Sequence, residues 1–447
     1  MTRLKCFFFC ILVLFYVAGA DIVYVASQRE KGATFRGAVA FELLDLFPTD
    51  ESDNVDLSNV KTWKELEYAV ETANNNGGGV ITLTSDIVFG ASISDETLPV
   101  IIVPLTIHGQ GRRVDAATTS MDERPVFQIE GSNADVIFED LTISGGYALF
   151  GGGGVSVEDG SINLIRCRVI NNYSEVSGGG GICVRNGMYA RFEDCEISDN
   201  EVIFQNSGGG IYFEGSSIDT LIVFKNCKIA DNRALGVGRG GGGVYVYRGF
   251  ALFDNCQLFG NTTAGPGGGL HIMDGRALFR NSQIDGNEAD EGAGLYFIRS
   301  DAEIYNCVIS GNHTNQRGRG GGILFNSLMG DLSLRMADTQ VSENTCGYVA
   351  GGIYVEMGRT FFNNVTVTNN MTMATFINAL AAGMYVPAPT IFKNTTVKNN
   401  NPKTYPDLYL NPISGGNFKT FGGNDIGSVG GRLFPQGGNG DKIAASR

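Results

Sequence analysis

Histidine and tryptophan are scarce in this 447-residue chain, with three copies and one copy. The histidines, His108, His271 and His313, lie far apart, and the cysteines form no C-x-x-C pairs, which excludes the usual zinc spacings. Acidic residues outnumber basic ones by 47 to 33, and the net charge of −14 argues against binding to nucleic acid. We therefore expect no metal site, no nucleic-acid partner and no cofactor, although an acidic protein could still take up calcium.

Long apolar runs are also missing after the first twenty residues, so no transmembrane segment is expected. Residues 1–20 combine basic Arg3 and Lys5, an apolar run from Phe7 to Val17, and the small residues Ala18-Gly19-Ala20. This order predicts a signal peptide and hence a secreted protein of the extracellular space or the cell surface. Seven of the nine cysteines follow it, and an odd number does not fit a closed disulfide framework.

Glycine, in contrast, is abundant, with 63 residues, and it clusters in a block that recurs nine times. Each block leads into a short apolar alternation such as GGGGVSV at Gly151 or GGGGICV at Gly178. The first apolar residues of the nine alternations are 25 to 33 residues apart, at Val155, Ile182, Ile211, Val244, Leu270, Leu295, Ile323, Ile353 and Met384. A period of this length indicates a repeat architecture.

A second block lies between the glycine blocks and reads, for example, FEDCEISDN at Phe192 and FKNCKIADN at Phe224. Each repeat therefore holds short strands with period-two alternation between Gly- and Asn-rich turns. One such unit cannot bury its apolar side alone, whereas stacked units share a continuous core. The sequence predicts an all-β solenoid of parallel strands.

The pairing of F-x-N-C-x-I-x-x-N with G-G-G-I-x-V resembles the repeats of polymorphic outer-membrane proteins and other pectin-lyase-like proteins. The resemblance covers roughly residues 80 to 430 and implies a right-handed parallel β-helix. It implies little about function, because that fold carries lyases, hydrolases, epimerases and adhesins.

The expected organisation is a signal peptide at 1–20, an unassigned segment at 21–61, the β-helix at 62–430 and a tail at 431–447. Thr62 and Glu65 have the spacing of a capping box, and Leu66, Ala69 and Val70 share one helical face. We expect a helix near 62–73 that covers the N-terminal end of the β-helix, where an uncovered coil would leave a strand edge open.

Stacking turns equivalent positions into columns about 4.8 Å apart. One column holds cysteine in five repeats and small residues in others, which predicts buried free thiols, with disulfides between neighbouring coils as the alternative. Its cysteines are Cys167, Cys195, Cys227, Cys256 and Cys307, whereas Cys183 and Cys346 lie outside it.

Two asparagine-rich columns are predicted to be structural turns. The first runs from Asp140 to Asn394 and the second from Asn172 to Asn400. Six of their members open N-x-S/T sequons, and glycosylation in a eukaryotic host would be patchy because buried amides cannot carry glycans. These candidates are Asn172, Asn261, Asn312, Asn364, Asn370 and Asn394.

The outward column beside the glycine blocks is rich in aromatic side chains. An exposed line of rings along a flat sheet could stack on sugars, although tyrosine also simply suits a half-exposed strand. The candidate ligand-binding residues are Tyr212, Tyr245, His271, Tyr296, Tyr354 and Tyr385.

No set of carboxylates on consecutive repeats stands out as a lyase or glycosidase centre, so no catalytic residue is assigned. Glu158, Glu214 and Glu356, beside Arg185, are interpreted as a solvated face. The favoured function is a non-catalytic protein acting in adhesion, matrix contact or binding of an extracellular polysaccharide or surface glycan. The alternative is a polysaccharide-active enzyme, a uronate lyase more readily than a hydrolase.

Overall fold

The computed structural model describes residues 55–89, 98–117, 125–204, 208–236, 238–328, 331–373, 381–387, 389–400, 405–411, 418–431 and 441–443. It also describes two short strands that pair antiparallel, β1 (Tyr16–Val17) and β2 (Ala20–Asp21). The rest of the predicted signal peptide and most of the segment 21–61 lie outside the described residues. The sections below concern the unit from Asn54 to Arg447.

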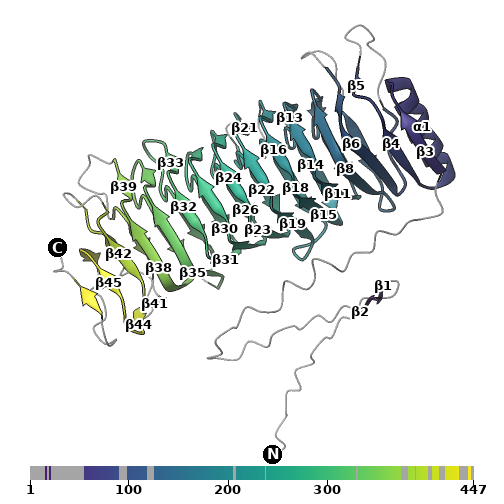
Figure 1. The fold of residues 1–447 in the computed structure, drawn as a ribbon. Helices are drawn as coiled ribbons and strands as arrows, with labels where there is room; N and C mark the ends of the chain where they lie inside the picture. The colour runs from purple at the N-terminus through teal and green to yellow at the C-terminus, as the bar shows by residue number, and fades with distance from the viewer. Residues whose placement is uncertain are drawn as a thin grey trace, which may run out of the picture. The chain divides into compact units, whose positions relative to one another are not determined.

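Parallel strands in this unit stack into three sheets that wind around one axis (Figure 1). Sheet I contains the alternations that follow the glycine blocks. Its twelve strands are β7 (Phe127–Glu130), β10 (Val155–Glu158), β14 (Ile182–Gly187), β18 (Ile211–Gly215), β22 (Val244–Tyr247), β26 (Leu270–Met273), β30 (Leu295–Ile298), β34 (Ile323–Asn326), β37 (Ile353–Met357), β40 (Met384–Val386), β43 (Leu408–Leu410) and β46 (Val429–Gly431).

Sheet II follows sheet I in each coil and contains the Phe/Cys blocks, usually as two strands separated by a bend. Its strands are β3 (Val55–Val60), β4 (Gly79–Leu83), β5 (Ile87–Val88), β6 (Leu105–Asp115), β8 (Asp135–Ser144), β11 (Ser161–Ile165), β12 (Arg168–Ile170), β15 (Tyr189–Glu193), β16 (Glu196–Ser198), β19 (Leu221–Lys225), β20 (Lys228–Ala230), β23 (Phe250–Asp254), β24 (Gln257–Phe259), β27 (Arg276–Arg280), β28 (Gln283–Asp285), β31 (Asp301–Tyr305), β32 (Val308–Ser310), β35 (Ser333–Ser342), β38 (Arg359–Thr368), β41 (Thr390–Lys393), β42 (Thr396–Lys398), β44 (Phe418–Thr420), β45 (Asp425–Ile426) and β47 (Lys442–Ile443).

Sheet III closes each coil with short strands before the next glycine block. They are β9 (Tyr147–Phe150), β13 (Tyr173–Ser177), β17 (Glu201–Val202), β21 (Arg233–Ala234), β25 (Thr262–Thr263), β29 (Glu288–Ala289), β33 (His313–Thr314), β36 (Thr345–Cys346) and β39 (Met371–Thr372). The all-β solenoid predicted from the sequence is therefore confirmed, and the twelve strands of sheet I mark about twelve turns within the described residues.

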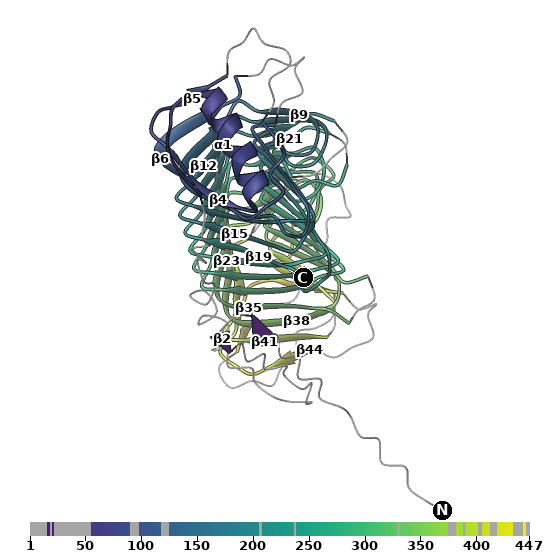
Figure 2. The ribbon, with the colours of Figure 1, turned by 90° about the vertical axis from the view of Figure 1, so that its right-hand side faces the viewer.

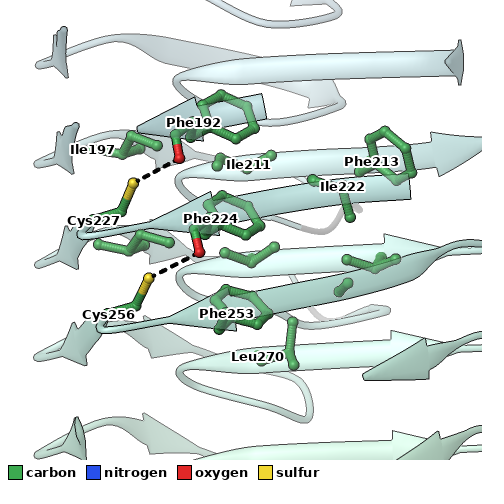
Figure 3. Close-up of a cluster of buried hydrophobic side chains, with 14 of the residues drawn as sticks. Phe192, Ile197, Ile211, Phe213, Ile222, Phe224, Cys227, Phe253, Cys256 and Leu270 are labelled. Atoms are coloured by element: carbon green, nitrogen blue, oxygen red, sulfur yellow. Dashed lines mark hydrogen bonds between the residues drawn. The ribbon is translucent and has the colours of Figure 1, made fainter. Parts of the chain in front are cut away.

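The core fills the inside of the coil with stacked apolar side chains (Figure 3). Phe192, Phe224, Phe253 and Phe279 lie one above another, with ring centroids 4.4 to 4.9 Å apart and nearly parallel planes. Their stacking follows from parallel, in-register pairing, which brings the same repeat position of every coil to the same place. The predicted inward columns of sheet I are likewise buried, for example Val155 and Val157.

The cysteine column is buried and reduced, as predicted. All seven described cysteines are free. Four of the five thiols in the column donate to a carbonyl of the previous coil, as Cys227 Sγ does to Phe192 and Cys256 Sγ to Phe224 (Figure 3). A small side chain with a weak donor fits this place, which explains its replacement by Ser282 and Thr339.

The first asparagine column forms the bend of sheet II. Asn226 has φ 54° and Asn364 also has φ 54°, a left-handed backbone that asparagine tolerates better than most residues. Their side chains are exposed and connect neighbouring coils, as where Asn226 Nδ2 donates to Asp194 Oδ1 at 2.9 Å. The predicted turn is confirmed, and it faces solvent.

The second asparagine column is a fully buried ladder between sheets II and III. Asn200 donates its backbone N–H (3.1 Å) and its side-chain Nδ2 (3.0 Å) to Oδ1 of Asn232 in the next coil. Nδ2 also donates to the carbonyl of Val169 in the previous coil, at 2.9 Å. The pattern repeats from Asn172 to Asn400, so each buried amide is satisfied by its neighbours.

The N-terminal end carries helix α1 (Trp63–Asn76), which lies across the end of the coil (Figure 2). Thr62 and Glu65 form the predicted capping box, and Gly77 ends the helix with φ 81°. The helix runs three residues beyond the predicted end. Strand β3 precedes it and pairs with β4, so the solenoid extends into the segment that the sequence left unassigned.

Candidate functional site

The predicted aromatic column lies on the outer face of sheet I and is in register. Tyr212 pairs with Tyr245, Tyr245 with His271, and His271 with Tyr296. Further along, Leu324 pairs with Tyr354 and Tyr354 with Tyr385. The column is therefore continuous, and none of its members belongs to the cluster that fills the coil.

The prediction that this column is exposed is wrong for five of its six candidate residues. Only Tyr296 is half-buried. The other five keep between 0 and 8% of their accessible surface: Tyr212, Tyr245, His271, Tyr354 and Tyr385. Two small apolar clusters outside the coil hold most of them. The rings therefore present no free line of faces to a sugar.

The loops that return from sheet III cover the column. A Cβ added to Gly267 would lie 2.9 Å from the Cβ of His271, so the glycine block packs closely against the base of this side chain. Gly179 shows how tight the turn is, because a Cβ there would lie 1.9 Å from the carbonyl oxygen of Ile182. The glycine blocks thus turn the chain and allow close packing against the base of the aromatic column.

His271 occupies the centre of this covered region. Its ring meets Tyr245 and Tyr296 edge-on, with centroids 4.9 and 4.8 Å away. Nδ1 contacts the carbonyl oxygen of Arg239, which belongs to the covering loop. Burial lowers the pKa of His271 to about 3, so the ring is neutral at pH 7 and acts as a packing group.

Arg319 secures the covering loop toward the C-terminal end of the column. Its Nε donates to Glu291 Oε1 at 2.8 Å, and Nη1 donates to the hydroxyl of Tyr354 at 3.2 Å. The guanidinium also lies over the Tyr354 ring, 4.9 Å from its centroid. These contacts span three coils, and they make the column a structural element.

A second outward column of sheet I brings charged side chains together. Glu130 pairs with Glu158, Glu158 with Arg185, and Glu214 follows on the next coil. Burial raises the pKa of Glu158. The positive charge of Arg185 lowers this pKa, whereas the negative charges of Glu214 and Glu130 raise it further. The sequence had suggested only scattered charges, because the strand that carries Glu130 precedes the regular repeats.

The sequons divide into two groups. Asn364 and Asn394 belong to the exposed bend of sheet II. The other four belong to the buried ladder and keep no accessible surface: Asn172, Asn261, Asn312 and Asn370. The fold therefore leaves two of the six candidate acceptors within reach of solvent.

The sequence reasoning missed a row of exposed apolar side chains beside sheet III. Phe150, Tyr173, Phe204 and Leu235 come from four consecutive coils and keep 59, 41, 54 and 39% of their accessible surface. Each lies one to four residues after a ladder position, on a short strand of sheet III or directly after one, and their register positions differ, since Phe150 pairs with Ser177 and Tyr173 with Tyr147. The signal that could have found them is an apolar residue just after the ladder asparagine, such as Tyr173 after Asn172.

Two further properties concern the described residues. None of their helices is long and apolar enough to cross a membrane. Within the same residues, no three His, Cys, Asp or Glu side chains gather in a way that could hold a metal ion.

Comparison with protein families matches the right-handed β-helix region at residues 126–277 and again at residues 209–401. Together these matches cover more than half of the 447 residues. The chain belongs to the right-handed β-helix family. Neither the curated proteins nor the solved structures gave a match. The family fixes the right-handed sense of the coil and agrees with the pectin-lyase-like fold predicted from the repeats.

Proposed function

We propose that this β-helix is a non-catalytic binding protein of the extracellular space or cell surface, acting in adhesion, matrix contact or glycan binding. The observation that supports the proposal is the apolar row of Phe150, Tyr173, Phe204 and Leu235. Single exposed apolar side chains are ordinary on soluble proteins, but a row on successive coils is a feature of contact surfaces. The signal-like residues 1–20 support the location.

These side chains come from the strands of sheet III and from the residues directly after them, and they do not share one column. Tyr173 lies in register with Glu201, and Glu201 with Arg233. The amides of Phe204 and Leu235 bond to the previous coil, at the carbonyls of Glu175 and Val202. Neighbouring coils are about 4.8 Å apart, so the four side chains form a staggered row, with one side chain from each of four successive coils.

Aromatic rings of this kind suit a partner that repeats along the axis. Phe150, Tyr173 and Phe204 provide large apolar area with little conformational freedom to lose on binding. A polysaccharide laid across these coils would meet rings from three of them. Glu201 and Arg233, an ion pair at 3.5 Å, border the row and offer polar groups to sugar hydroxyls.

The test is retention of the purified secreted protein on uronate and neutral polysaccharides and on extracellular matrix. The triple variant Phe150→Ser/Tyr173→Ser/Phe204→Ser is expected to lose at least tenfold in affinity. Phe421→Ser is the matched control, because Phe421 is 66% exposed but lies at the last coils of sheet II. Equal binding by the triple variant, or no binding by the wild type, would contradict the proposal.

The charged column of sheet I favours a second candidate, a polysaccharide-active enzyme of the uronate lyase type. Such an enzyme needs a basic group beside carboxylates, and Arg185 lies between Glu158 and Glu214 on neighbouring coils. Release of unsaturated ends from uronate polysaccharides, measured with and without calcium, tests it. Product formation that disappears in Arg185→Gln and persists in the triple apolar variant would replace the first proposal with this one.

A further inference from the structure

We propose that Asn364 and Asn394 are the N-glycan acceptors of the folded protein, and that the four ladder sequons are incompatible with a glycan in the native fold. This inference goes beyond the binding function and rests on separate observations. All six sequons have the same local sequence form, N-x-S/T, so the sequence alone cannot divide them.

In the ladder asparagines, both hydrogens of Nδ2 already take part in hydrogen bonds. Asn261 Nδ2 donates to the carbonyl of Ile229 at 2.9 Å and to Oδ1 of Asn287 at 3.0 Å. Asn370 Nδ2 does the same with Val341 and Asn400. An N-linked sugar replaces one hydrogen of Nδ2, so it would break the ladder bond and force a sugar into a space without solvent.

The two bend asparagines lack this conflict. Asn364 is exposed, and its Nδ2 donates to Oδ1 of Asp338 at 2.7 Å. A glycosylated Asn364 keeps one N–H, which is enough for this bond. Asn394 is also exposed and occupies the same bend one coil further on, with φ 49°. Both positions therefore tolerate a sugar without a change in the fold.

The hydroxyl residues of the two groups also differ in their surroundings. Thr366 and Thr396 are in register on the outer face of sheet II, where they are half-buried. In the ladder sequons the corresponding residue is buried beside sheet III, as Thr263 and Thr314 are. Ala234 and Ala289 fill the same place in other coils. The four ladder sequons thus combine an amide ladder with a small buried side chain, two packing requirements that happen to lie two residues apart.

Glycan transfer in a eukaryotic secretory pathway acts on the chain before the coils close. Whether a glycosylated chain can then fold depends on which asparagine carries the glycan. A chain modified on the ladder cannot complete the affected coil and is retained. A chain modified at the bend folds normally. The secreted, folded protein should therefore carry glycans at Asn364, Asn394 or both.

The experiment expresses the full chain behind a host export signal in a eukaryotic host and maps glycopeptides in the secreted and the retained protein. The expected result is occupancy at Asn364 or Asn394 in the secreted fraction, with Asn172, Asn261, Asn312 and Asn370 unmodified there. Ladder glycopeptides should appear only in the retained fraction.

Two matched variants separate the sugar from the structure. Thr366→Ala/Thr396→Ala removes both bend sequons but keeps both asparagines, and its secreted form should have the mobility of the deglycosylated wild type. Thr366→Ser/Thr396→Ser keeps the sequons and should restore the glycan. Secreted, folded protein with a glycan on any ladder asparagine overturns the proposal, as does secreted wild type with less than a tenth occupancy at both bend sites.

Discussion

Asn400 donates two hydrogen bonds to one carboxylate oxygen of Asp407, from its backbone amide at 2.7 Å and from Nδ2 at 3.2 Å. The other oxygen accepts from the amide and the hydroxyl of Ser428, at 2.9 and 3.1 Å. Every ladder asparagine donates toward the C-terminal end, so the ladder needs an acceptor where it stops. A carboxylate, which only accepts, fits that end.

Replacement of this terminal acceptor should loosen the last coils. Asp407→Ala leaves the Asn400 and Ser428 donors without acceptors and is expected to destabilise the C-terminal coils by about 1 to 3 kcal/mol. Hydrogen exchange should speed up across residues 395–430 and remain unchanged near Phe253, because a solenoid opens locally. Asp219→Ala, at an exposed turn, is the control. Equal exchange in both variants would mean that the ladder needs no terminal acceptor.

The two asparagine columns should respond differently to substitution within one coil. Asn287→Ala removes the acceptor of Asn261 and a donor to Asn312 inside the ladder, which should cost about 2 to 4 kcal/mol. Asn281→Gly changes the exposed bend at φ 51°, a conformation that glycine adopts freely, and should cost less than about 1 kcal/mol. Denaturant melts of the two variants compare them directly, and similar losses would contradict the assignment of separate roles.

His271 should make the fold sensitive to acid. Its pKa is lowered to about 3 in the fold, so the unfolded chain binds the proton first as the pH falls below about 6.5. The contribution of His271 to the free energy of unfolding is therefore fully present above that pH. It decreases by about 1.4 kcal/mol per pH unit as the pH falls toward 3. His271→Phe removes the titrating group, so its denaturant midpoint should fall less steeply from pH 6 to pH 4 than that of the wild type. Parallel slopes would show that the ring is accessible to protons.

The buried thiols should be unreactive in the native protein. Burial raises the pKa of Cys183 to about 11 and that of Cys346 to about 12, which suppresses the reactive thiolate at pH 8. Alkylation of the seven cysteines after residue 20 should be at least a hundredfold slower in the native state than in denaturant. An intact mass two units lower per pair would instead reveal disulfides between neighbouring coils.

Much of this molecule could be predicted from the sequence because a solenoid repeats its own environment. The positions of Phe224, Cys227 and Asn232 recur at each coil, so the same packing requirement appears in the sequence once per repeat. The capping box at Thr62 was visible for a different reason, because helix ends are decided by contacts within four residues. Strand β3 was not visible, since it lies before the helix and outside the repeat.

The candidate site could not be predicted in the same way. The outward position of Tyr245 follows from alternation, but its burial depends on where the loop through Arg239 returns. Loops of different lengths carry no period, so nothing in the sequence indicates which side of sheet I they cover. The exposed row that includes Phe150 escaped notice because strands of two to five residues show almost no alternation.

By itself the sequence determined the coil, its inward columns, the cysteine column and the two asparagine columns, because these depend on spacing that stacking preserves. Only the tertiary structure decided which outward side chains meet solvent. It buried the tyrosine column beneath loops such as those through Arg239 and Arg319, exposed the staggered apolar row beside sheet III, and divided six N-x-S/T sequons into four buried and two accessible ones. The physical reason is that spacing fixes which residues share a column, whereas exposure depends on what the rest of the chain places over that column.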